Sequence, residues 1–235
     1  MGNKYSMQLI GLIGGMSWES TVTYYQVVNR VVKEQLGGLH SARCLLHSVD
    51  FAEVEACQKE GRWEDGAAIL AEAARSLEAG GADFFLICTN TMHKVADAVR
   101  SAVFIPLLHI GEVTAEELLK AGVRKAALLG TSYTMEQDFY KAKLVERGID
   151  VLIPDEAQRR SINEIIFSEL CRGVIREESR SFLHGVITSM KARGAEAVIL
   201  GCTEIGLLVR AEDSVLPGFD TTLIHASRAA LQALE

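Results

Sequence analysis

Residues 84–91 read Phe-Phe-Leu-Ile-Cys-Thr-Asn-Thr, and residues 198–204 read Val-Ile-Leu-Gly-Cys-Thr-Glu. Each stretch is an apolar run that ends at a cysteine followed by a threonine, and each follows a tripeptide of glycine, alanine and an acidic residue. Short apolar runs that precede helix-like segments are typical of the buried strands of a parallel sheet. The repeated pattern predicts a duplicated architecture in which each half presents one thiol, Cys88 or Cys202.

A second pair of similar segments is separated by nearly the same number of residues as the first pair. Residues 10–15 read Ile-Gly-Leu-Ile-Gly-Gly, and residues 127–131 read Ala-Leu-Leu-Gly-Thr. Glycines between a strand and a helix indicate either that the backbone approaches a small anion, such as a carboxylate, or that the chain makes a tight turn. Their spacing is not that of a dinucleotide-binding loop, and the sequence contains no Walker-type phosphate loop.

Apolar runs and helical periodicity alternate along the whole chain. The pattern predicts strands at residues 8–13, 43–49, 84–88, 104–110, 125–129, 150–153, 198–202 and 215–219. It predicts helices at residues 18–36, 65–78, 91–102, 112–120, 135–147, 158–171, 177–193 and 221–234, with an irregular polar stretch at residues 50–63. Strands that alternate with helices form parallel sheets with right-handed crossovers. We therefore predict an α/β fold of two pseudosymmetric lobes, each a parallel sheet flanked by helices.

The 235 residues suffice for two lobes, each of about 100–120 residues with its own core. No linker or low-complexity stretch separates the halves, and the closing helix is expected to return to the first lobe. We predict that the first lobe contains residues 1–110 plus 218–235 and the second residues 111–217. The active site is expected in the cleft between the lobes.

The composition is that of an ordinary globular protein, with 49% hydrophobic residues, 23% charged residues and a net charge of −7. An acidic chain without a basic patch disfavours nucleic acid and anionic membranes as partners. No apolar stretch approaches the roughly 20 residues of a membrane span, and no secretory signal is recognised, so we predict a cytoplasmic protein. The first six residues formally fit a myristoylation pattern, although a short extension before the first strand is the simpler interpretation.

Five cysteines are scattered along the chain, at positions 44, 57, 88, 171 and 202. They form no C-x-x-C motif and no cluster with the spacing of metal ligands, so neither a disulfide framework nor a metal site is predicted. Cys44, Cys57 and Cys171 are interpreted as structural. Cys88 and Cys202 differ from them because each is expected at the carboxyl end of a parallel strand, where α/β sheets bind ligands, and each precedes a helix whose N-terminus favours a thiolate.

Two opposed thiols without metal or cofactor suit the inversion of a carbon centre. One thiolate removes the α-proton from one face, and the other thiol delivers a proton to the opposite face, so the two groups titrate as a coupled pair. The carbanion that forms between these steps requires hydrogen-bond donors near the substrate carboxylate. The candidates for this role are Thr89, Asn90, Thr91 and Thr203.

At these residues the sequence resembles the aspartate/glutamate racemase superfamily, and most closely its broad-specificity amino-acid racemase branch. The resemblance rests on residues 11–20 (GLIGGMSWES), 88–93 (CTNTMH) and 201–205 (GCTEI), and extends to residues 47–51 (HSVDF), 129–135 (LGTSYTM) and 219–222 (FDTT). It implies racemisation without pyridoxal phosphate or another cofactor, an amino acid as the small-molecule partner, and a homodimer. It also implies that Cys88 and Cys202 are catalytic. The residues expected to bind the substrate are Thr89, Asn90, Thr91, Thr203, Met16, Ser17, His47, Asp50 and Thr131.

The chain departs from the pattern of racemases dedicated to acidic substrates. Those enzymes carry an arginine in the loop after the second strand, and residues 48–53 contain none. Specificity for aspartate and glutamate and a broader specificity for neutral amino acids therefore both remain open. Arg159 or Arg160 could supply a cation instead, or could be a solvated helix start.

Other polar residues have a functional and a structural interpretation. His93 could tune the thiol of Cys88, or form structural hydrogen bonds on its helix. Glu204 could orient the thiol of Cys202 or receive an ammonium group, or it could cap a helix or be exposed to solvent. His109 and His225 have no assignment. Other functions also remain open: hydantoin racemase, maleate isomerase or arylmalonate decarboxylase chemistry, a non-catalytic amino-acid sensor, or thiol redox exchange.

Overall fold

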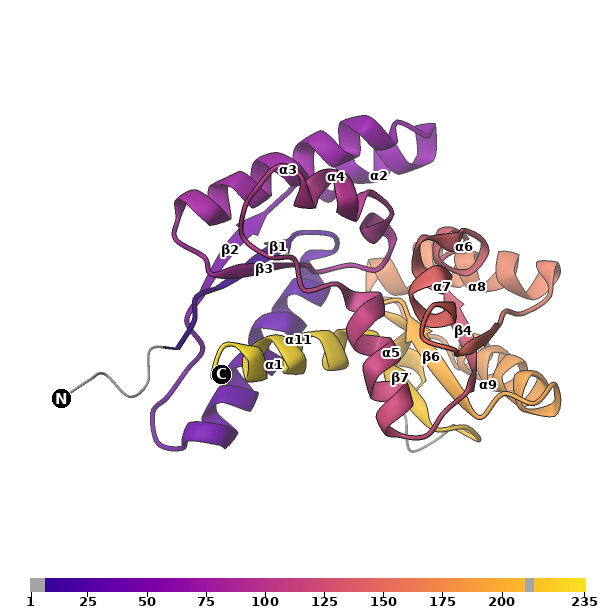
Figure 1. Ribbon diagram of the computed structural model, residues 1–235. Helices are drawn as coiled ribbons and strands as arrows, with labels where there is room; N and C mark the ends of the chain where they lie inside the picture. Colours follow the sequence, from indigo (N-terminus) through magenta and orange to yellow (C-terminus); the bar gives the residue numbers. More distant parts are fainter. Residues whose placement is uncertain (1–6, 210–213) are drawn as a thin grey trace. The chain divides into compact units, whose positions relative to one another are not determined.

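The computed structural model describes residues 7–209 and 214–235 of the chain. It divides into two compact units (Figure 1). The first unit runs up to Ile110 and includes His225–Glu235, and the second is Gly111–Ile224. The N-terminal hexapeptide with the myristoylation-like pattern lies outside the described residues.

The first unit is built on a three-stranded parallel sheet. Its elements are β1 (Ile10–Gly14), α1 (Trp18–Leu36), β2 (Cys44–Ser48), α2 (Phe51–Glu60), α3 (Trp63–Ala79), β3 (Phe84–Ile87), η1 (Thr91–Val95) and α4 (Ala96–Arg100). The strand order is β2-β1-β3. The register pairs Gly14 with Ser48, and Ile13 with Ile87, so all three strands end at the same edge of the sheet.

Two helical layers cover this sheet. On one face, Ile10 and Leu12 of β1 pack against α1 and against the last helix, α11 (Thr221–Gln232). On the other face, Ile13 packs against α3. Figure 1 shows α1 and α11 on one side of the strands and α3 on the other. The alternation follows from the pleat of the strand, which directs successive side chains to opposite faces.

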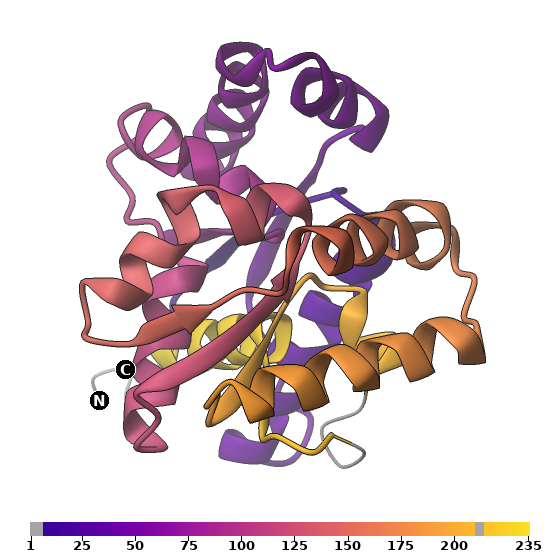
Figure 2. The same ribbon diagram turned by 90° about the vertical axis from the view of Figure 1, so that its right-hand side faces the viewer.

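The second unit repeats this plan with four strands. Its elements are α5 (Ile110–Lys120, which begins at the last residue of the first unit), β4 (Lys125–Gly130), α6 (Ser132–Glu136), α7 (Asp138–Val145), β5 (Asp150–Leu152), α8 (Glu156–Ser168), η2 (Leu170–Arg172), α9 (Glu177–Ala192), β6 (Ala197–Gly201), α10 (Ile205–Leu208) and β7 (Gly218–Asp220). The parallel sheet has the order β5-β4-β6-β7. Leu129 and Leu200 of the central strands pack against α8 and α9, and Figure 2 shows α9 in orange beside the strands.

Two parallel sheets flanked by helices confirm the predicted α/β class. The strand expected at residues 104–110 is wrong, because this segment makes only an isolated bridge between Leu107 and Phe85. Pro106 has no N–H to donate to a ladder. The amides of Phe104 and Ile105 donate to the Glu78 carboxylate, over 2.6 and 3.1 Å, instead of to a neighbouring strand.

The irregular stretch expected at residues 50–63 is also wrong, because α2 lies there. Asp50 caps the start of the helix with its carboxylate, which accepts from the amide of Ala52 over 3.0 Å, and Gly61, in the left-handed conformation, caps its end. Both are ordinary helix-boundary residues. The start and stop signals were therefore present in the sequence, but the hydrophobic periodicity between them was weak.

Smaller differences concern element boundaries. The helix expected at residues 91–102 begins as the 3-10 helix η1, and the helix expected at 135–147 is divided into α6 and α7 at Gln137, whose backbone is extended. Residues 218–224, which the sequence analysis assigned to the first lobe, lie in the second unit, where β7 pairs with β6. None of the helices in residues 7–209 and 214–235 combines the length and apolar character that a membrane span requires.

Candidate active site

The carboxyl edge of the first sheet gathers three of the segments that the sequence analysis selected. The register places the ends of β1, β2 and β3 side by side. Met16 and Ser17 follow β1, His47 and Asp50 lie at and beyond the end of β2, and Cys88 follows β3 directly. This is the edge at which α/β sheets bind their ligands. Residues from three separate segments of the sequence are thus brought to one edge of the first unit.

The glycines after β1 form a tight turn. Gly15 has φ 93°, and a Cβ atom there would lie 2.1 Å from the carbonyl oxygen of Val49. The Gly15 amide donates to the Thr21 hydroxyl over 2.8 Å, and the Val49 amide donates to the Gly14 carbonyl over 3.0 Å. Of the two interpretations of these glycines, the structure therefore favours the tight turn, because the Gly15 amide already has a partner within the turn.

Four of the expected substrate-binding residues near this turn have identifiable structural environments. Ser17 caps α1 by accepting from the amide of Ser20 over 3.3 Å, and Asp50 caps α2. Met16 is buried in the apolar core beside α3, and His47 is half-buried in β2. Contact of these four residues with a substrate stays a prediction.

Cys88 is completely buried at the end of β3. Its amide donates to the Ile13 carbonyl of β1 over 2.9 Å, which fixes the backbone of the residue to the central strand. Its side chain belongs to the apolar cluster between the sheet and α1. Asn90 and Thr91, which follow, are buried, and Thr89 is half-buried. The expected catalytic residue and the Thr-Asn-Thr segment thus lie next to each other at the carboxyl edge.

The second sheet has an equivalent edge. Gly130 of β4 pairs with Gly201 of β6, and a Cβ atom on Gly130 would lie 2.8 Å from the Gly201 carbonyl oxygen. A Cβ atom on Gly201 would lie 3.0 Å from the Leu129 carbonyl oxygen, so there is little room for a side chain at either position. Thr131 follows Gly130, is buried, and caps α6 by accepting from the Thr134 amide over 3.3 Å. Cys202 follows Gly201 directly, so each thiol stands one residue beyond a strand adjacent to β1 or β4.

Cys202 has a polar neighbour. Its thiol donates to Oε2 of Glu204 over 3.1 Å, and the Thr203 hydroxyl donates to the same oxygen. Glu204 is 6% exposed, so this carboxylate lies inside the second unit. Of the interpretations that the sequence allowed for Glu204, the structure supports contact with the thiol, and solvent exposure is wrong.

The expectation that helix N-termini would favour thiolates at both cysteines is wrong. Burial raises the pKa of the Cys88 thiol above its ordinary value. Burial, and then the nearby Glu204 carboxylate, raise the pKa of the Cys202 thiol well above its ordinary value. The physical reason is that desolvation disfavours the charged form. The helical segments after the thiols do not compensate for it, because η1 starts only three residues after Cys88 and α10 has only four residues.

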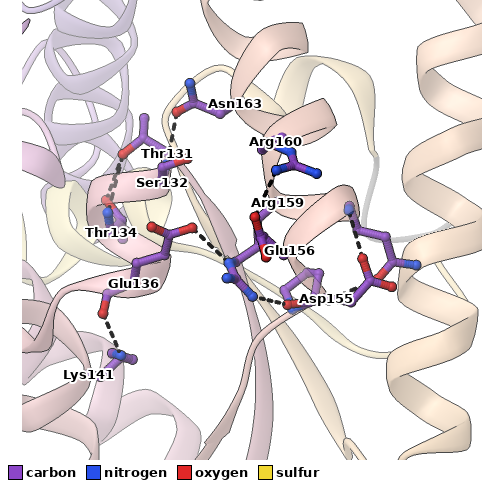
Figure 3. Close-up of polar contacts among 12 residues, drawn as sticks. Thr131, Ser132, Thr134, Glu136, Lys141, Asp155, Glu156, Arg159, Arg160 and Asn163 are labelled. Carbon is purple, nitrogen blue, oxygen red and sulfur yellow. Dashed lines mark hydrogen bonds and ion pairs between the residues drawn. The ribbon is translucent and has the colours of Figure 1, made fainter.

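Neither arginine proposed for a substrate carboxylate is unpaired. Arg159 Nε lies 2.8 Å from Oε1 of Glu136, and its Nη1 donates to the Pro154 carbonyl over 2.7 Å. Arg160 pairs with Glu156 over 2.7 Å, and its side chain is 70% exposed. Figure 3 shows Arg159 directed at Glu136 and Arg160 directed at Glu156. The interpretation as a solvated helix start fits Arg160, whereas Arg159 joins α8 to α6.

An open apolar pocket of about 420 Å³ also lies on the first unit. It is lined by Trp18, Thr21, Val22, Tyr25, Leu46 and Ser48. Ser48 ends β2 at the carboxyl edge, but neither Cys88 nor Thr89 lines the pocket. The pocket therefore reaches the edge that carries the candidate residues without including the thiol.

His109 and His225, for which the sequence predicts no role, are both buried near His93 in the first unit. These histidines come from three separate segments, so no local pattern in the sequence could have joined them. The hydrogen-bonding interpretation of His93 is confirmed, since both of its ring nitrogens contact backbone groups.

The family of the chain follows from this arrangement together with its sequence. A family model described as Asp/Glu/Hydantoin racemase matches residues 13–230, a span that contains both thiols. The chain belongs to the Asp/Glu/Hydantoin racemase family, a family of isomerases. The resemblance stated from the sequence motifs is thereby confirmed.

Solved structures and curated proteins agree with this placement. A candidate Asp/Glu racemase from Yersinia pestis is 52% identical, with a TM-score of 0.92 over 97% of this chain and 100% of that one. An aspartate racemase homologue from Pyrococcus horikoshii OT3 is 36% identical, with a TM-score of 0.85 over the same shares. The broad-specificity amino-acid racemase RacX of Bacillus subtilis is 26% identical over 153 residues, which are 65% of this chain and 66% of RacX.

Proposed function

We propose that the protein is a cofactor-independent amino-acid racemase in which Cys88 and Cys202 are the two catalytic bases. The observation that carries the proposal is the matched placement of the two thiols. Each follows a strand that neighbours β1 or β4, at the carboxyl edge of its own parallel sheet. The aspartate racemase homologue and RacX, to which the chain is similar, support racemisation as the reaction.

In the proposed reaction the thiols act on opposite faces of one α-carbon. One cysteine, as the thiolate, removes the α-proton, and the other, as the neutral thiol, donates its proton to the opposite face. After one turnover the protonation states of the two sulfurs have exchanged. The reverse reaction starts from that exchanged form, so the pair titrates as one coupled unit.

The raised pKa of each thiol has a consequence for this cycle. A desolvated thiolate is a strong base, which favours removal of a weakly acidic α-proton, but it is seldom formed without help. Glu204 is in a position to help at Cys202, because its carboxylate already accepts the thiol hydrogen. We propose that Glu204 holds this proton while Cys202 is the thiolate.

The carbanion formed between the two proton transfers carries charge into the substrate carboxylate. Donors that are fixed before the reaction stabilise such charge most effectively. We propose that the side chains and amides after each thiol supply them, with the turn residues at the same edges completing the substrate site. These residues are Thr89, Asn90, Thr91, Thr203, Met16, Ser17, His47, Asp50 and Thr131.

The substrate class is the finer part of the proposal. The relatives are named for aspartate, for aspartate or glutamate, and for broad specificity. The loop after β2 contains no arginine, and Arg159 is already paired with Glu136. We therefore propose a specificity that includes amino acids with neutral side chains besides aspartate and glutamate.

The proposed setting is the cytoplasm, and the proposed assembly is a homodimer. Five free cysteines suit a reducing compartment. Light scattering coupled to gel filtration tests the assembly, since a monomer mass near 25.6 kDa would contradict a dimer.

The test of the function is chiral chromatography after incubation with single enantiomers of a panel of amino acids. Wild-type protein is expected to convert at least one of them to the racemate without added cofactor. Cys88→Ala and Cys202→Ala are each expected to abolish conversion, whereas Cys57→Ala, a buried thiol in α2, is expected to retain it. An amino acid that raises the unfolding temperature but keeps its chirality would instead support a sensor.

A further inference from the structure

Three of the six histidines are buried together in the first unit. The ring of His93 lies 4.5 Å from that of His109 and 5.8 Å from that of His225, between ring centroids. They come from η1, from the segment before α5, and from α11. The proposed reaction uses none of them, so their burial calls for another account.

The hydrogen bonds of His93 define its protonation state. Nε2 lies 3.2 Å from the amide nitrogen of Ile110, and Nδ1 lies 2.8 Å from the carbonyl oxygen of Thr89. An amide can only donate and a carbonyl can only accept. His93 is therefore the neutral tautomer with its proton on Nδ1, and a second proton on Nε2 would face the Ile110 N–H.

His225 makes a similar connection. Its Nε2 lies 2.8 Å from the carbonyl oxygen of Leu108 and must donate to it, and its Nδ1 lies 2.8 Å from the Tyr24 hydroxyl. Neutral His225 thus accepts from Tyr24. The chain of contacts runs from α1, through α11, to the segment before α5.

This segment is where the chain passes between the units. The first unit ends at Ile110 and resumes at His225. Leu108 is held to β3 by its amide, which donates to the Phe85 carbonyl over 2.9 Å. His93 therefore binds the segment that leaves the first unit, at Ile110. His225 binds the same segment at Leu108 and lies in α11, where the chain returns to the first unit.

The other end of the His93 bridge is the residue after Cys88. The Cys88 amide is bound to β1, and the Thr89 amide donates to the Ile87 carbonyl over 2.8 Å. The bond from His93 Nδ1 to the Thr89 carbonyl fixes the next peptide unit, so Thr89 is held through both its amide and its carbonyl. The backbone on both sides of the thiol is thus tied down, which restrains the direction of the sulfur.

We propose that His93 is a positioning residue, which joins Thr89, the residue after Cys88, through its carbonyl to the amide of Ile110, where the chain leaves the first unit. The inference rests on the proposed role of Cys88 as a catalytic base. It predicts that the bond from Nδ1 to Thr89 matters more for turnover than the bond from Ile110 to Nε2. Misplacement of a reacting group by about 1 Å costs roughly 100-fold in rate.

Two substitutions separate the bonds. His93→Asn places an amide donor near the position of Nδ1 and has nothing at the position of Nε2, whereas His93→Gln can accept from Ile110 and has no donor for Thr89. His93→Phe removes both bonds at similar volume. His184→Asn, at a half-buried histidine in α9, is the matched control. The assays are kcat and KM on the substrate found with wild-type protein, the iodoacetamide labelling rate of Cys88 relative to Cys202, and the thermal unfolding temperature.

We expect His93→Asn and His184→Asn to keep kcat within about threefold of wild type, and His93→Gln to lose about 100-fold with little change in KM. The Cys88 labelling rate should change in His93→Gln and His93→Phe, while that of Cys202 should not. Equal kcat in the Asn and Gln variants, or losses that follow only their unfolding temperatures, would overturn the proposal. Failure of the proposed function would be distinct, since wild-type protein would then racemise nothing.

Discussion

The Cys202 thiol donates a hydrogen bond to the Glu204 carboxylate over 3.1 Å, inside the second unit. Each thiol belongs to an apolar cluster of its own unit, but burial raises the pKa of Cys88, whereas burial and then the Glu204 carboxylate raise that of Cys202. The two thiols therefore occupy equivalent strand ends in chemically different environments. In the proposed reaction this difference distinguishes the two directions of racemisation.

Replacing Glu204 tests this difference. In Glu204→Gln we expect kcat to fall about 100-fold, because an amide cannot take the thiol proton. Since the carboxylate charge raises the pKa of Cys202, its loss should lower that pKa and accelerate alkylation of Cys202 at pH 8. Steady-state kinetics and peptide mass spectrometry measure the two effects. Glu164→Gln, on an exposed position of α8, is the control, and unchanged kcat and labelling in Glu204→Gln would contradict the assignment.

The buried histidines predict how stability depends on pH. Burial, with a smaller contribution from His93, lowers the pKa of His225 to about 3, and burial with the nearby His109 and Arg100 lowers the pKa of His93 well below its ordinary value. The unfolded chain takes up protons below about pH 6.5, while the folded protein does not. The contribution of these two histidines to stability is therefore fully present above that pH. It is lost as the pH falls toward their pKa values in the folded protein.

The expected slope is at most about 1.4 kcal/mol per pH unit for each of these histidines. Urea unfolding at pH 7, 6 and 5 measures it. His225→Asn should be less stable at pH 7 and should show a shallower loss toward pH 5, because one proton uptake on unfolding is removed. A wild-type stability that is constant over this range, or a variant with the same slope, would contradict the account.

The turn after β1 predicts that substitution by alanine destabilises the protein more at Gly15 than at Gly61, although both glycines have positive φ. Gly15→Ala should destabilise the protein by more than about 2 kcal/mol, because backbone strain is added to a clash with the Val49 carbonyl. Gly61→Ala has a similar φ of 72° but open space around the added methyl group, so about 1 kcal/mol is expected. Urea unfolding compares them, and equal losses would show that the close approach to Val49 is unimportant.

The contacts of Arg159 predict that its replacement leaves the preference between aspartate and alanine unchanged. Its guanidinium is occupied by Glu136 and by the Pro154 carbonyl, so Arg159→Met should cost about 0.5–1 kcal/mol of stability. The ratio of kcat/KM for aspartate to that for alanine should stay within about threefold of wild type, a difference under about 1 kcal/mol. Arg160→Met, whose side chain is exposed, is the control. A selective loss of aspartate turnover in Arg159→Met alone would assign the arginine to the substrate.

Much of the fold was predictable because its signals are local. The strands before Cys88 and Cys202 are uninterrupted apolar runs, and their duplication predicts two equivalent sheets. The segment at residues 104–110 is similarly apolar but does not form a strand. The amides of Phe104 and Ile105 donate instead to the carboxylate of Glu78, which is distant in the sequence. Such a competitor is invisible to any local pattern.

The candidate site was predictable in its residues but not in its electrostatics. The motifs indicated the thiols and the turn residues. The strand registers place the residues of each half at the carboxyl edge of that half's own sheet. The sequence wrongly predicted easily ionised thiols, because the extent of burial at Cys88 depends on α1 and α11, which pack over it. The contacts among Tyr24, His93 and His225 likewise depend on segments that only the fold brings together.

The most direct test of the central claim is where deuterium appears when one enantiomer is incubated with the enzyme in D₂O and the reaction is stopped early. If Cys88 and Cys202 serve opposite faces, mass spectrometry of the separated enantiomers will find deuterium at the α-carbon of the product, while the remaining substrate keeps its proton. Deuterium in both enantiomers at equal rates, or turnover that survives in Cys88→Ala or Cys202→Ala, would contradict the two-thiol account.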